Sequence, residues 1–164
     1  MLRRRPVLQN AGAVLFLCLG LTTAGCSPGP VEFDPPVVRG TDASACRRLF
    51  DALPSSVSEQ QRRDVEPEEG YGAAWGDPAI VLRCGVGRPA GFDDFSTCQV
   101  TDGVGWFIPE RQITGQAVDV LMTTVDREPA VEVRIPAAYF PPAATMVDLA
   151  PAITASSEQE DPCL

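Results

Sequence analysis

From Val131 to Ile135 the sequence reads VEVRI, a strict alternation of apolar and charged side chains. Successive side chains of a β-strand point to opposite faces, so this pattern predicts a strand with one buried and one solvated face. Val118–Val125 alternates in the same way, and Asp126–Pro129 is typical of a turn between the two stretches. The region therefore predicts two neighbouring antiparallel strands.

Further strands are expected on the N-terminal side of this pair. Ile80–Val86 alternates in the same manner. Cys98–Thr101 and Val104–Ile108 flank Asp102-Gly103, a dipeptide typical of a tight hairpin turn. Because short turns join adjacent strands in antiparallel order, we expect one antiparallel sheet of about four to five strands.

One helix is expected on each side of this strand region. The first has apolar residues at positions 46, 49, 50 and 53, the spacing of one helical face, with Asp42 or Ser44 as its N-cap and Pro54 after its end. The second begins near Thr145, where the sequence resembles a capping box. The expected fold class is α+β, with two layers and with the N-terminal and C-terminal helices packed on one face of the sheet.

The other segments divide the chain into a leader, a linker and one domain. Residues 26–41 are rich in proline and lack a periodic pattern, so we expect a linker between a leader of residues 1–25 and a single domain of residues 42–164. Within the domain, residues 55–78 are polar and are expected to form a loop. Their acidic cluster lacks the residue spacing of a calcium loop and is typical of a solvated surface.

The leader indicates export. Arginines 3–5 precede an apolar run from Ala11 to Leu21, which is too short for a membrane span of about 20 residues and fits a secretory signal peptide. Small residues then precede Cys26, as in bacterial lipoprotein signals. We therefore expect a lipid on Cys26 and a location on the outer face of the cytoplasmic membrane. The alternative is a leader cut nearby and a soluble secreted protein.

Composition excludes several kinds of chemistry. The leader holds three of the 13 basic residues and none of the 22 acidic ones, so the rest of the chain carries a net charge of −12. Such a chain is a poor partner for nucleic acid, whose phosphates attract Lys and Arg. There is no histidine, and every basic residue is arginine, which excludes Ser-His-Asp and Cys-His pairs and lysine Schiff bases. No metal and no cofactor are expected.

Four cysteines lie outside the leader and the lipidation motif. Cys46, Cys84, Cys98 and Cys163 are separated by gaps of 38, 14 and 65 residues, too wide for a zinc site, and an even number in an exported chain predicts two disulfides. We expect Cys84–Cys98, because these residues lie on consecutive strands. We also expect Cys46–Cys163, because these residues lie beside the two helices.

A family resemblance rests on landmarks that occur in order along the chain. These are the lipoprotein-like leader, Cys46, AAWGDP (73–78), IVLRCGV (80–86), GVGWF (103–107) and PAVEVRIP (129–136). Together they resemble the actinobacterial secreted proteins that carry domain of unknown function 3515. The resemblance implies an exported, often lipid-anchored envelope protein. It implies no activity and no catalytic residues.

Candidate functional residues are few. Trp75 and Trp106, with Asp77 close to Trp75 in sequence, are the best candidates for a ligand surface, because aromatic faces stack on sugars and cations. In a small domain with few aromatic residues, however, a place in the core is the more common one for both indoles. A carboxylate pair among Asp77, Asp93 and Asp94 is the alternative, a hydrolase of wall glycans. We favour a non-enzymatic module that binds an envelope protein or a cell-wall component.

Overall fold

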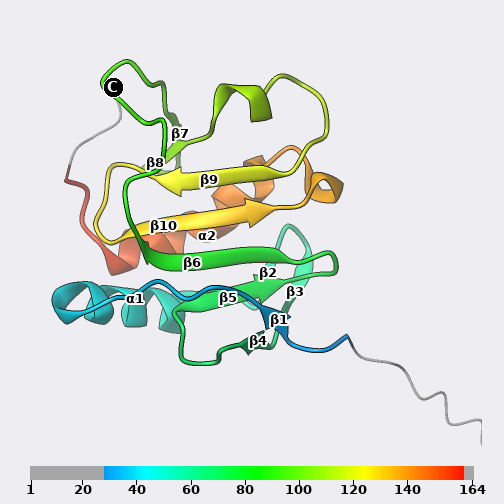
Figure 1. Cartoon of the computed structure of the whole chain (residues 1–164), viewed down its shortest axis with the longest axis vertical. Helices are drawn as coiled ribbons and strands as arrows, with labels where there is room; N and C mark the ends of the chain where they lie inside the picture. Colours follow the sequence, from blue (N-terminus) through cyan, green and yellow to red (C-terminus); the bar gives the residue numbers. More distant parts are fainter. Residues whose placement is uncertain (1–27, 161–164) are drawn as a thin grey trace, which may run out of the picture.

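The computed structural model describes residues 28–160 and contains an eight-stranded sheet with two helices on one face (Figure 1). The strand order is β2-β3-β5-β6-β10-β9-β8-β7, and every pairing in this sheet is antiparallel. Its strands are β2 (Ser56–Val57), β3 (Gln60–Arg63), β5 (Gly72–Trp75), β6 (Ile80–Val86), β7 (Gln99–Thr101), β8 (Val104–Phe107), β9 (Val120–Thr124) and β10 (Ala130–Ile135). A separate parallel pair joins β1 (Val31–Glu32) to β4 (Val65–Glu66).

The centre of the sheet matches the alternating stretches of the sequence. In β10, Val133 pairs with Leu82 of β6 on one side and with Met122 of β9 on the other. All three side chains are buried, whereas Glu132 and Arg134 of β10 lie on the opposite face. The α+β class and the antiparallel sheet are therefore confirmed.

The expectation of four to five strands is wrong, because the sheet has eight. Three of the additional strands, β2, β3 and β5, lie within residues 55–78, which were predicted to be a polar loop. All four residues of β5 are buried, and all four residues of β3 are polar, so neither strand shows an alternation. A periodic pattern detects only strands with one buried and one exposed face.

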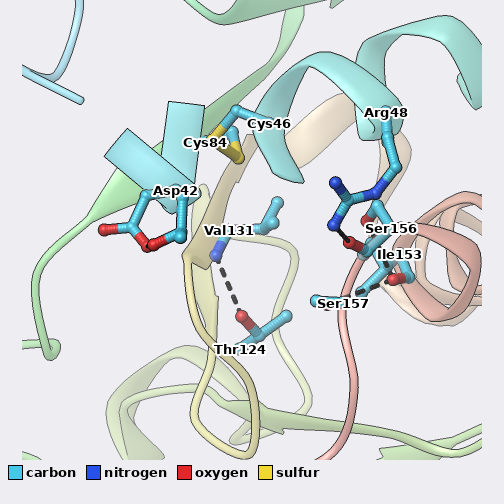
Figure 2. Close-up of a disulfide and its surroundings, with 10 residues drawn as sticks. Asp42, Cys46, Arg48, Cys84, Thr124, Val131, Ile153, Ser156 and Ser157 are labelled. Carbon is cyan, nitrogen blue, oxygen red and sulfur yellow. Dashed lines mark hydrogen bonds between the residues drawn. A yellow bond between two sulfur atoms is a disulfide. The ribbon is translucent and has the colours of Figure 1, made fainter. Parts of the chain in front are cut away.

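The helices α1 (Gly40–Ala52) and α2 (Ala143–Ser156) pack against each other on the same face of the sheet. Arg48 of α1 donates to the carbonyl oxygen of Ser156 at 2.9 Å (Figure 2). The predicted caps are wrong, since the N-cap residues are Arg39 and Pro142 and neither side chain makes a capping bond. Thr145 is instead buried inside α2 and shares a hydrogen bond with the hydroxyl of Ser58 at 2.7 Å.

The predicted disulfide pairing is also wrong. Cys46 of α1 is bonded to Cys84 of β6, with 5.6 Å between the Cα atoms (Figure 2). The sheet order explains the error: β10, β9 and β8 lie between β6 and β7, so strands that are consecutive in sequence are not neighbours here. Cys98 is disulfide-bonded as well, and Cys163 lies outside the described residues.

Residues 29–38, within the predicted linker, form a strap over the sheet face that the helices leave open. Arg83 donates to the carbonyl oxygen of Asp34 at 3.1 Å, and Val38 contacts Gly85. The ring of Phe33 lies in a notch formed by Gly70 and Gly72, where a Cβ at Gly72 would overlap the ring. Because these two glycines lack side chains, the strap can pack directly against the backbone at their positions.

We expect the Cys46–Cys84 bond to contribute strongly to stability. It joins residues 38 apart in sequence, and closing a loop of that length restricts the unfolded chain by roughly 4 kcal/mol. The double variant Cys46→Ala, Cys84→Ala should lower the free energy of unfolding by about that amount in urea titrations.

Non-reducing peptide mapping provides the control for this experiment. The map should join Cys46 to Cys84, and we expect it to join Cys98 to Cys163, because Glu160 and Cys98 line one cleft. A double variant as stable as wild type would show that the bond is dispensable.

The glycine notch gives a second prediction. Gly72→Ala should destabilise the domain by about 1–3 kcal/mol, because its methyl group overlaps the Phe33 ring. Gly87→Ala is the matched control, since no heavy atom lies within 4 Å of its Cβ position, and it should change stability by less than about 0.5 kcal/mol. In a Phe33→Ala background the cost of Gly72→Ala should largely disappear. An equal loss of stability in both backgrounds would show that the destabilisation does not come from contact with the Phe33 ring.

Candidate functional site

An open cleft of about 590 Å³ lies at the end of β6, between the loop that follows this strand and the β9–β10 turn. The start of α1 and the segment after α2 complete its wall. Its ionisable lining residues are Asp42, Arg88, Asp93, Asp94, Asp126, Arg127, Glu128 and Glu160. Six carboxyl groups thus face two guanidinium groups.

Two buried charges from the β9–β10 turn lie in this lining. Asp126 and Arg127 have side-chain exposures of 0% and 6%, and Arg127 Nε lies 3.6 Å from Asp126 Oδ1. The other guanidinium nitrogens of Arg127 donate to the carbonyl oxygens of Ser157 at 2.7 Å and Gly103 at 2.6 Å. Asp126 Oδ2 accepts from Gln159 at 2.9 Å. The pair therefore joins the end of α2 to the β7–β8 hairpin.

The facing atoms of this ion pair are incompletely satisfied. Neither Asp126 Oδ1 nor Arg127 Nε has a hydrogen-bond partner among residues 28–160. A buried polar atom without a hydrogen bond costs about 1–3 kcal/mol. Asp126 Oδ1 therefore depends on the charge of Arg127, 3.6 Å away, for its stabilisation.

The rim of the cleft is acidic and exposed. Asp42, Asp93, Asp94, Glu128 and Glu160 are all exposed to solvent. Exposed carboxylates that share a concave surface concentrate negative potential and attract cations. The cleft therefore presents a net negative surface.

Aromatic residues in the loop after β6 support this rim. Arg88 lies over the ring of Phe92, with 4.7 Å between the guanidinium carbon and the ring centroid. Phe92 in turn packs edge-on against Phe107 of β8, with 5.2 Å between centroids. Phe95 of the same loop is 95% exposed. The loop thus combines one anchored and one free aromatic ring with the acidic rim.

Neither predicted tryptophan lies on the surface. Trp75 and Trp106 both have 0% exposure and belong to the core, so neither indole presents a face to a ligand. Trp75 Nε1 donates to the carbonyl oxygen of Pro54 at 3.1 Å, whereas Trp106 Nε1 has no partner among the described residues. Arg62 lies 5.7 Å from the Trp75 ring, and burial lowers the pKa of this guanidinium from its ordinary value.

The structure also separates the carboxylates that were expected to flank one cleft. Asp77 is 71% exposed and lies 3.9 Å from Arg63, in the turn before β6. Asp93 and Asp94 follow the other end of this seven-residue strand, which is roughly 20 Å long. Asp77 therefore belongs to a different surface from the cleft.

The central pair of the cleft was missed by sequence reasoning. Asp126 and Arg127 were interpreted only as part of a turn. Charged residues between two strands are usually solvated, and no pattern in the sequence indicates that these two are buried. Cys26 and Cys163, the predicted lipidation site and disulfide partner, lie outside the described residues.

Metal-binding clusters and membrane-spanning helices are both absent from residues 28–160. This part of the chain contains no group of three or more His, Cys, Asp or Glu side chains placed to hold a metal ion. Its helices are all too short or too polar to cross a membrane.

Comparison with known families assigns the chain to one of them. Residues 10–162 match the model of a family described as protein of unknown function (DUF3515). The chain belongs to this family. No curated protein and no solved structure matches this DUF3515 chain. The cleft is therefore interpreted from its own geometry.

The ion pair of the cleft gives a testable expectation. Arg127→Met should lower the free energy of unfolding by about 3–5 kcal/mol, because it leaves the buried Asp126 carboxylate without its cation. Arg111→Met is the matched control at an exposed position and should cost less than about 0.5 kcal/mol.

A double variant distinguishes the loss of the ion pair from the loss of side-chain packing. Asp126→Asn combined with Arg127→Met should cost less than the sum of the single changes, because no charge is then stranded. Additive costs in chemical denaturation would show that the two side chains act independently.

Proposed function

We propose that this protein is an exported module of the cell envelope. In this proposal a lipid on Cys26 holds it to the outer face of the cytoplasmic membrane, and its domain binds a cationic segment of another envelope protein without catalysis. The signal-like leader and the apolar run before Cys26 support export and anchoring.

The observation that carries the binding proposal is the charge of the cleft. Five exposed carboxylates surround it, with Arg88 as the exposed cation among its lining residues. A guanidinium or ammonium group of a partner would neutralise this rim.

Exposed apolar side chains favour a polypeptide partner over a free cation. Phe95 is almost wholly exposed, and Val100 on the edge strand β7 is 58% exposed. Apolar side chains beside a charged rim are typical of surfaces that bind proteins. A basic segment that carries apolar residues would contact both features.

The geometry gives less support to the alternative, a glycan hydrolase. Such enzymes need an acid and a base within about 10 Å of each other, one of them in an environment that keeps it protonated. Asp77 lies at the far end of β6, and Asp93 and Asp94 are exposed. Asp126 is buried, but it is committed to Arg127 and Gln159.

A binding experiment tests the proposal. A hexa-arginine peptide should bind the wild-type domain with an affinity that falls as salt is raised, because the contacts are between charges. The triple variant Asp93→Asn, Asp94→Asn, Glu128→Gln should bind about tenfold more weakly, if each lost contact contributes about 0.5 kcal/mol. Isothermal titration calorimetry measures both affinities.

The control removes the same charge from a distant acidic cluster. Asp64→Asn, Glu68→Gln, Glu69→Gln lies outside the cleft and should leave the affinity within about twofold, since it changes only long-range attraction. If both triple variants weaken binding equally, the peptide is attracted by net charge alone and the cleft is not its site.

A further inference from the structure

The strap of residues 29–38 begins beside one end of the sheet and is held there by its backbone. Arg63 donates to the carbonyl oxygens of both Gly29, at 2.5 Å, and Gly76, at 3.1 Å. A single guanidinium therefore places Gly29 beside the turn that precedes β6. The amide of Val31 donates to the carbonyl oxygen of Asp64 at 2.8 Å, which extends this attachment along β4.

The rest of the strap is held equally firmly. The amide of Phe33 donates to the carbonyl oxygen of Glu66 at 3.1 Å, and its ring fills the notch at Gly70 and Gly72. Figure 1 shows this blue segment passing from β1 over the sheet to α1. The strap thus leaves little freedom between its first residue and the domain.

The predicted lipid attachment point lies very close to this start. Cys26 precedes Gly29 by three residues, and a chain of that length spans at most about 11 Å. A lipid on Cys26 would therefore be tethered within about that distance of Gly29, which lies beside Arg63 and the β5–β6 turn. The cleft lies past the other end of β6, roughly 20 Å away.

We infer that the strap sets the orientation of the domain on the membrane, with the β5–β6 turn at the lipid surface and the acidic cleft directed away from it. This inference rests on the proposed lipid anchor. The partner would then approach from the side of the cell wall, and the membrane would not cover the cleft.

Charge alone would not produce this orientation. The strap and β4 place Glu32, Asp34 and Glu66 around a small hollow near the start of the strap. Carboxylates are repelled by anionic headgroups, so this end of the domain has no electrostatic reason to face the bilayer. The short covalent tether and the packed strap supply the constraint instead.

Energy transfer from the domain to the membrane tests the inference. Gln61→Cys on β3, near the start of the strap, and Ala90→Cys in the loop beside the cleft are both exposed positions for a donor dye. Each full-length lipid-bearing protein is added to phosphatidylcholine vesicles that carry an acceptor dye on their headgroups. Transfer should be severalfold stronger from position 61 than from position 90.

Variants of the strap test whether the strap causes this orientation of the domain. Phe33→Ala, or Arg63→Gln if the former lowers stability, should bring the two transfer efficiencies toward each other. Phe95→Ala is the matched control, because this ring is exposed and lies outside the strap. It should leave the difference in transfer efficiency between positions 61 and 90 unchanged.

The outcomes separate this inference from the proposed anchor. Cys26→Ser should abolish vesicle binding, and if it binds as wild type does, the lipid anchor is wrong and the inference fails with it. Membrane binding with equal transfer from both positions would overturn the orientation alone. A difference that persists in both strap variants would show that another contact sets the orientation.

Discussion

The disulfide between Cys46 and Cys84 is the constraint on which the rest of the fold depends. It joins the first helix to a central strand of the sheet, at a point where both side chains are buried. The residues between the two cysteines must then return within a closed ring, and they form β2, β3 and β5 on one side of β6, together with β4, which pairs with β1. Because α2 packs along α1, the same bond helps to hold both helices over the core.

Strands with one exposed and one buried face were predictable from the sequence, and the other strands were not. Ile80–Val86 agrees with β6 residue for residue, since alternation records burial on one face only. β5 is buried along its whole length, and β3 carries only glutamine and arginine, so their place in the sheet depends on pairing with β6 and β5. The disulfide partners were mistaken because the order of strands in space differs from their order in sequence.

The candidate site was even less visible in the sequence. The tryptophans were candidates for a ligand surface because they are large aromatic residues. The same size favours their burial in the core of a domain of this kind, where both lie. The cleft is instead assembled from a turn, a loop and two helix ends that are far apart in the chain. Its buried pair, Asp126 and Arg127, is ordinary in sequence and becomes notable only because α2 ends above it.

The parallel pairing of β1 with β4 has a mechanical consequence. A pull on residue 28 acts along β1, whereas the bonds from Val31 to Asp64 and from Phe33 to Glu66 run across it. The two bonds are therefore loaded together in shear rather than opened one after the other, and the Phe33 ring in its glycine notch resists sliding in the same direction. Tension from the N-terminal side is thus borne first by β4 and the strap.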